Sequence, residues 1–224
     1  MVERPGNKRP DYQHERPVMP RNVVFDLGNV LISFKPSEFL AQKNYSPDLS
    51  ETIMNDIFRS RDWQLVDEGA ITISEAISNI ITRSSLKRHE ITQIFDYRKE
   101  IMFPLDQNIK ILPELKKHGF KLYYLSNFPM DIFEDIRYSY GFFKYFDGGI
   151  ISAEVKLAKP DARIYRALIE KYSLTAGECL YIDDLEINVT AAESAGMTGY
   201  HTSGSLEISE EIRRRLVTGF NYSF

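Results

Sequence analysis

The sequence has little cysteine, no long apolar run and no excess of basic charge. Cys179 is the only cysteine among 224 residues, which excludes a disulfide within the chain and indicates a reducing compartment. No apolar run is long enough to span a bilayer or to form a secretory signal, so we expect a cytoplasmic protein without a membrane partner. The formal net charge of -4 gives no electrostatic reason to expect nucleic acid as a partner.

Composition and length are ordinary for a globular protein. Hydrophobic residues make up 43% and charged residues 27% of the chain, whose 224 residues suffice for one substantial domain with an insertion. Residues 1–20 differ from the rest, because repeated prolines and a polar composition leave no helical or strand period. We interpret them as a disordered tail, since acidic residues weaken the alternative of a basic arm for an acidic partner. A monomer is compatible with these patterns.

Apolar runs alternate with helical periods over residues 21–34 and 105–224. The runs at 23–25, 120–125, 150–151, 179–182 and 198–201 predict strands, and the segments between the later runs predict helices. Strands that alternate with helices are typical of a parallel sheet covered on both faces. We therefore predict an α/β fold, with a doubly wound parallel sheet formed by these two parts of the chain.

Residues 35–104 show helical periodicity instead. Thr72 and Glu75 have the spacing of a capping box, and a stripe of apolar residues follows them on one helix face: Ile73, Ala76, Ile77, Ile80 and Ile81. A further stripe includes Ile91, Ile94, Phe95, Ile101 and Met102. These patterns predict a small all-helical domain inserted at 35–104.

The methionine, tryptophan and charged residues of this insert need no functional role to explain them. Met54, Met102 and Trp63 fit a helical core better than a cofactor site. Asp67, Glu68 and His89 are expected on the solvated surface, because charged side chains are mostly exposed.

Polar residues stand where several of the predicted strands end. These residues are Asp26, Ser126-Asn127 and Asp183-Asp184, and Lys159 opens a helix after a short strand. Each alone has a structural explanation, since a serine can cap a helix, a lysine is usually solvated and an aspartate often forms a turn. Because a parallel sheet brings the carboxyl ends of its strands to one edge, their joint occurrence predicts a functional site there.

These segments resemble the motifs of the haloacid dehalogenase superfamily, chiefly its phosphatase branch. The first motif is matched at 25–31, the second at 125–127, the third at 159–165 and the fourth at 182–184. The resemblance covers about residues 21–218, and it implies that the helical insert is a cap domain over the active site. The Asp-Leu-Gly first motif is similar to that of bacterial sugar phosphatases such as those acting on glucose 1-phosphate.

The resemblance implies a hydrolase of small phosphorylated metabolites. Asp26 would attack phosphorus and form an aspartyl-phosphate, which divides one difficult displacement into two easier ones. Ser126, the Asn127 amide and Lys159 would hold the transferring oxygens and compensate their charge.

The resemblance also implies Mg²⁺ as cofactor. This hard ion prefers oxygen ligands, which Asp26, the backbone carbonyl of Gly28 and Asp184 would provide. Asp183 would bind a metal-bound water or orient the site through contacts with these ligands.

Gly28 is a departure from the family pattern. Most phosphatases of the family carry a second aspartate at this position, which protonates the leaving alkoxide and later activates water. Positioned acid-base catalysis contributes roughly 10²–10⁴-fold, or about 3–5 kcal/mol of barrier. We expect a cap residue or a substrate hydroxyl to supply the missing proton.

Gly28 keeps two alternatives open. A 2-haloacid dehalogenase also lacks the second aspartate, but it gains nothing from the acidic pair Asp183-Asp184. A non-catalytic binding protein with this fold would explain Gly28, but not the retention of Asp26, Ser126 and Lys159 together.

Overall fold

The computed structural model describes residues 19–202 and 208–217, and in it a five-stranded sheet has the order β5-β4-β1-β6-β7. The strands are β1 (Asn22–Phe25), β4 (Lys121–Ser126), β5 (Gly148–Ile151), β6 (Cys179–Asp183) and β7 (Thr198–His201), and every pair is parallel. The predicted α/β class with a parallel sheet is confirmed. Most of the expected tail, residues 1–18, lies outside the described residues, as do residues 203–207 and 218–224 of the predicted core.

Helices cover both faces of the sheet, because successive side chains of a strand point to opposite sides. Val23 and Phe25 belong to an apolar cluster with α8, α9 and α13, whereas Val24 packs in a second cluster with α11 and α12. The helices of this core are α7 (Asp106–Ile109), α8 (Ile111–Lys117), α9 (Met130–Ser139), η2 (Gly141–Tyr145), α10 (Ser152–Val155), α11 (Ala162–Lys171), η3 (Ala176–Glu178), α12 (Glu186–Ser194), α13 (Ile208–Ile212) and η4 (Arg213–Val217).

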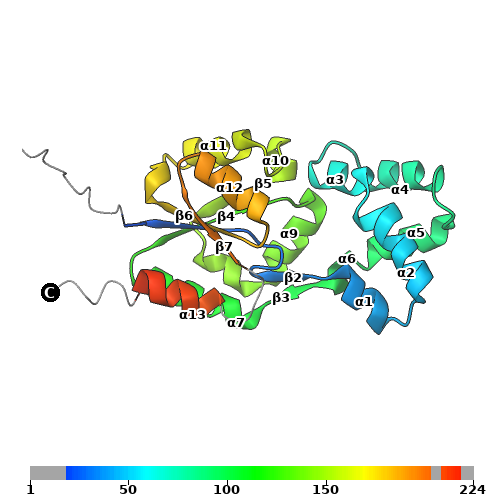
Figure 1. Ribbon diagram of the computed structural model, residues 1–224, viewed down its shortest axis with the longest axis horizontal. Coiled ribbons are helices and arrows are strands. Elements are labelled where there is room, and N and C mark those ends of the chain that lie inside the picture. The colour runs from blue at the N-terminus through cyan, green and yellow to red at the C-terminus, as the bar shows by residue number, and fades with distance from the viewer. Residues whose placement is uncertain (1–18, 203–207, 218–224) are drawn as a thin grey trace, which may run out of the picture.

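A two-stranded antiparallel ribbon, β2 (Ile32–Phe34) with β3 (Met102–Pro104), joins the sheet to the helices between these strands. We call residues 36–101 the cap segment, which lies at one end of the molecule (Figure 1). It contains α1 (Pro36–Gln42), α2 (Pro47–Ile53), η1 (Met54–Phe58), α3 (Arg61–Asp67), α4 (Ile73–Ile81), α5 (Arg88–Asp96) and α6 (Arg98–Ile101). Met102 begins a strand, so its assignment to a helical stripe was wrong.

The cap segment has an apolar cluster of its own, which includes Trp63, Ile80 and Ile91. The predicted capping box is present at the start of α4, where Thr72 and Glu75 bind each other's backbone N–H. A separate cluster is what an inserted domain requires, and it supports our proposal of a cap domain at 35–104 and a core at 21–34 and 105–224. No helix in the described part of the chain is long and apolar enough to cross a membrane.

This packing predicts a large cost for a cavity in the cap segment. Ile91→Ala removes a fully buried side chain and should lower the free energy of unfolding by about 2–5 kcal/mol. Ile187→Ala, at a position that is 63% exposed, is the control and should change it by less than about 0.5 kcal/mol. Urea denaturation measures both values, and equal values would contradict this description of the cap core.

Candidate active site

The sheet brings the predicted strand-end residues together. Asp26 follows β1, which lies between β4 and β6 in the sheet. Phe25 is paired with Tyr124 on one side and with Ile182 on the other, so the next residues of all three strands reach the same edge. Ligands of open α/β sheets bind outside this edge, close to where the strand order reverses.

Asp26 is a buried carboxylate with two partners from the predicted set. The Ser126 hydroxyl donates to Asp26 Oδ1 at 2.7 Å, and Lys159 Nζ lies 2.8 Å from the same oxygen. Burial raises the pKa of Asp26 to about 6, against the opposite effect of the Lys159 charge. Burial also disfavours the charged form of Lys159, but Asp26 and Asp183 outweigh it and raise the pKa of the lysine. Lys159 therefore carries a positive charge beside the nucleophile candidate.

Asp183 is fully buried and both of its oxygens are already used. Oδ2 accepts from Lys159 Nζ at 2.6 Å and from the Tyr181 hydroxyl, while Oδ1 accepts from the Leu185 N–H at 2.8 Å. The Asn188 amide donates to Oδ1 at 3.0 Å and to Oδ2 at 3.1 Å. This carboxylate therefore fixes Lys159, and it anchors the beginning of α12 to the end of β6.

Asp184 has a different environment from its neighbour. It is half-buried, and its Oδ2 accepts from the Asn29 amide at 3.2 Å. Burial raises its pKa above the ordinary value, against the effect of that hydrogen bond. Asp26, Asp183 and Asp184 each offer an oxygen within 4.8 Å of the others, and an all-oxygen set of this kind fits a hard divalent cation.

Asn127 holds Lys159 through two hydrogen bonds. Its side-chain amide donates to the Lys159 carbonyl at 3.0 Å, and its side-chain oxygen accepts from the Lys159 N–H at 2.8 Å. The sequence predicted that Asn127 binds substrate, and the side chain serves here to position the lysine. The loop that carries Lys159 is thereby tied to the end of β4.

Sequence reasoning missed three residues of the site: Asn29, Tyr181 and Asn188. Tyr181 stands two residues before Asp183, so the strand period places both on one face of β6, which is a usable signal. Asn29 has a left-handed backbone with φ of 52°, and its side-chain oxygen accepts from the Phe34 N–H at 3.0 Å. Asn188 lies on α12, five residues after Asp183. The turn between β6 and α12 brings the two side chains together, and no sequence period predicts this contact.

A cavity of about 270 Å³ lies over Asp26 between the sheet edge and the cap segment. Its lining includes polar side chains such as those of Asp67, Asn127 and Lys159, the backbone of Gly28, and six apolar residues: Phe34, Trp63, Met102, Phe128, Pro129 and Leu185. Phe34 and Trp63 stack with ring centroids 5.9 Å apart. The cavity therefore presents both polar and apolar side chains to a molecule bound over the nucleophile.

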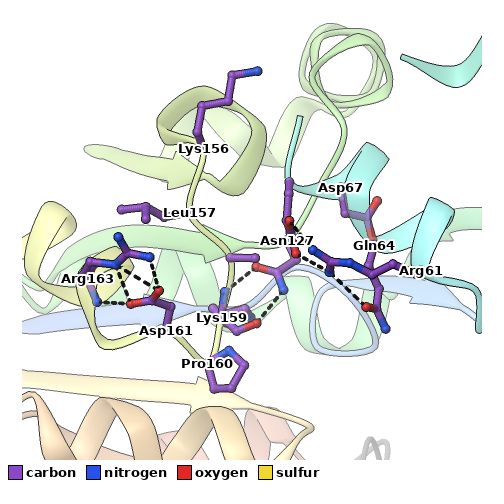
Figure 2. A pocket seen from close by; sticks show the side chains of 12 residues that line it. Arg61, Gln64, Asp67, Asn127, Lys156, Leu157, Lys159, Pro160, Asp161 and Arg163 are labelled. Carbon is purple, nitrogen blue, oxygen red and sulfur yellow. Dashed lines mark hydrogen bonds and ion pairs between the residues drawn. The ribbon is translucent and has the colours of Figure 1, made fainter. Parts of the chain in front are cut away.

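A second, polar cleft of about 540 Å³ adjoins this cavity, and Asp67, Asn127 and Lys159 line both. Figure 2 shows α3 contributing Arg61, Gln64 and Asp67 to one side of this cleft. Asp67 was expected on the solvated surface, but it is half-buried in the wall of both spaces, whereas His89 is exposed as expected. Glu68 is half-buried and pairs with Arg61 at 2.8 Å.

Comparison with known proteins agrees with this geometry. Residues 20–196 match the model of the family described as haloacid dehalogenase-like hydrolase. The chain belongs to this family. It is a hydrolase with the family's parallel sheet, and the resemblance drawn from the sequence motifs is confirmed.

Individual relatives of this hydrolase are distant. It is 27% identical to the sesquiterpene phosphatase astK of Aspergillus oryzae over 86% of this chain and 94% of that protein. The solved HAD family enzyme bt-2542 of Bacteroides thetaiotaomicron shares its fold at 21% identity, with a TM-score of 0.68 over 87% of this chain and 99% of that one. The L-2-haloacid dehalogenase RSc1362 shares the fold at 19% identity, with a TM-score of 0.64 over 82% of this chain and 86% of that one.

The unequal environments of Asp183 and Asp184 predict unequal effects on stability. Asp183→Asn replaces an acceptor with an amide N–H among buried donors and should lower the free energy of unfolding by about 1–3 kcal/mol. Asp184→Asn keeps a half-buried polar group beside Asn29 and should change it by less than about 0.5 kcal/mol. Urea denaturation in EDTA measures both, and a larger cost for Asp184→Asn would show that the network around Asp183 is not structural.

Proposed function

We propose that this hydrolase is a magnesium-dependent phosphomonoesterase that acts through an aspartyl-phosphate on Asp26. The observation that carries the proposal is the buried Asp26 carboxylate, 2.8 Å from Lys159 and close to the carboxylate of Asp184. An anionic nucleophile approaches a phosphate ester only where positive charge compensates the repulsion. The phosphatase relative supports this reaction class, as does a structure of bt-2542 with magnesium and inorganic phosphate.

The donor atoms present fit Mg²⁺. Asp26, the Gly28 carbonyl and Asp184 would hold the ion, since the oxygens of Asp183 are occupied by Lys159, Tyr181 and Asn188. When bound, Mg²⁺ supplies positive charge that neutralises the phosphate and favours the ionised form of Asp26. These contacts support Asp184 as a ligand and Asp183 as a supporting residue.

The side chains around Asp26 have distinct roles in the proposed reaction. Asp26 forms the new bond to phosphorus, and Ser126 and Lys159 provide an O–H and an ammonium group beside it. These donors are in place before substrate binds, so they stabilise charge that develops on the phosphate oxygens without large rearrangement. Asn127 and Asp183 hold Lys159 from its backbone and its ammonium group respectively.

The alternative of dehalogenation has less support from the site. Gly28 suits it, and a dehalogenase has this fold. Displacement of halide from carbon needs no cation, however, and Asp184 then has no function beside Asp26. A halocarboxylate is also smaller than the apolar cavity above the nucleophile.

The cavity favours a phosphate ester with an apolar organic group. Six of its lining residues are apolar, and they include the stacked pair Phe34 and Trp63. The hydroxyl groups of a sugar would find no partners on these apolar side chains, and buried polar groups without partners cost free energy. The named activity of the Aspergillus relative on a sesquiterpene agrees with this choice, and a sugar phosphate stays the alternative.

The nucleophile is tested by Asp26→Asn. This variant should lose phosphatase activity by about 10⁴-fold or more, because the amide cannot attack phosphorus. It should remain folded, since Asp183 still pairs with Lys159. Phosphate release and circular dichroism measure the two effects, with wild-type protein in EDTA as a second inactive sample. Activity in either sample near that of the wild type with Mg²⁺ would contradict the proposed function.

The apolar substrate is tested by Leu185→Ser and a matched control. Leu185 is 54% exposed and lines the cavity, so serine should leave the fold intact and raise KM for a prenyl monophosphate by about tenfold, or about 1.4 kcal/mol. Ile187→Ser, at an exposed position two residues further on, should leave KM unchanged. Wild-type preference for a hexose monophosphate over the prenyl ester would contradict the assignment.

A further inference from the structure

Gly28 leaves the site without the side chain that protonates the leaving oxygen in most family members. An aliphatic alkoxide is a poor leaving group, so an enzyme acting on an alkyl ester needs a proton donor beside that oxygen. We propose that Asp67, at the end of α3 in the cap segment, is this donor. The inference rests on the proposed phosphatase function and adds a catalytic residue to it.

The position of Asp67 carries the proposal. It lines the cavity over Asp26, together with Lys159 and Asn127. The other carboxylates that line this cavity, Asp26 and Asp184, lie at the sheet edge and already serve as nucleophile and metal ligand in the proposed function. Asp67 is the acidic residue of the cap segment that lines the cavity. Trp63 stands one helical turn earlier on α3 and also lines the cavity, so this face of α3 is directed at the site.

Contacts with the core fix the backbone of Asp67. The hydroxyl of the fully buried Ser152 donates to the Asp67 carbonyl, and Lys156 Nζ donates to the Gly69 carbonyl. Gly69 has a left-handed backbone with φ of +63°, and a Cβ there would lie 2.9 Å from Ala153 Cα. Only glycine allows so close an approach, so the turn after α3 is docked on α10 and holds Asp67 at the site.

The surroundings of Asp67 favour its protonated form. Burial raises its pKa well above the ordinary value, against the opposing effects of the Trp63 side chain and the Arg98 charge. The negative charge of Glu68 adds to the rise. A carboxyl group kept neutral in this way has a proton to donate.

The proton and electron changes balance over the two half-reactions. Asp26 forms an O–P bond, the ester P–O bond breaks with its electron pair on the leaving oxygen, and Asp67 transfers its proton to that oxygen. The alcohol leaves, with Asp67 now a carboxylate. Water then forms an O–P bond and gives a proton to Asp67, while the Asp26 O–P bond breaks with its electron pair on the Asp26 carboxylate. Both aspartates are restored, and phosphate is released.

The structure also allows a second proton donor to be introduced at position 28, which would test the role of Asp67 independently. A Cβ added to Gly28 would lie 3.7 Å from Asp26 Oδ2, an ordinary contact, and Gly28 lies outside the left-handed region of the backbone. An aspartate at position 28 therefore fits beside the nucleophile, where the usual family acid stands.

The experiment compares kcat/KM for an alkyl phosphate and for p-nitrophenyl phosphate, whose leaving group needs no proton. Asp67→Asn should lower the value for the alkyl ester by about 10²–10⁴-fold and leave the aryl ester near wild type. Asp48→Asn, at an exposed aspartate of the cap segment that lines neither the cavity nor the cleft, should change neither value. Gly28→Asp in the Asp67→Asn background should recover most of the alkyl activity.

Other outcomes overturn the inference. An equal loss on both esters would mean that Asp67 is only structural, and no loss on either would mean that another group donates the proton. Hydrolysis of neither ester by the wild type would refute the proposed function, and this inference with it. A wild type that is active and depends on Asp26, but is indifferent to Asp67, would refute the inference alone.

Discussion

The buried ion pairs of Lys159 are the interactions on which the site depends. An ammonium group that is nearly removed from water is costly unless it is compensated, and here it lies between Asp26 at 2.8 Å and Asp183 at 2.6 Å. The three residues come from β1, β6 and the loop before α11, so their pairing fixes three separate parts of the chain. Asp26→Asn leaves the lysine its pair with Asp183, whereas loss of Asp183 also removes the contacts that tie β6 to α12, so Asp183 is the more sensitive position.

Much of this arrangement could be predicted from the sequence, because it follows from sheet geometry. Short apolar runs ending in Asp26, Ser126 and Asp183 indicate parallel strands, and parallel strands end at one edge. The sequence therefore predicted which residues meet. It did not predict the role of each residue. Hydrogen bonds to Asp183 come from α12 and from the loop that carries Lys159, and those to Asn127 come from the same loop. How these two segments approach the sheet depends on the tertiary structure.

Asp67 shows where sequence reasoning fails. A charged residue at a helix end is usually solvated, and the position of Asp67 one helical turn after Trp63 points to the site only once Trp63 is known to line the cavity. Ser152, which is far along the chain, binds the backbone carbonyl of Asp67, and local sequence does not encode this tertiary contact. The apolar cavity wall escaped prediction for a related reason, since Phe34, Trp63 and Phe128 are separated in sequence and read individually as core. The orientation of the cap residues in this wall depends on docking of the cap segment on the core, which no local pattern encodes.

The central claim is that Asp26 becomes covalently phosphorylated. Acid quenching during turnover of a phosphate ester with Mg²⁺, followed by peptide mass spectrometry, tests it most directly. The account predicts a phosphate adduct on the peptide that contains Asp26, and its absence from a sample quenched in EDTA. Steady hydrolysis with an unmodified Asp26, or with the adduct on another residue, would contradict the account.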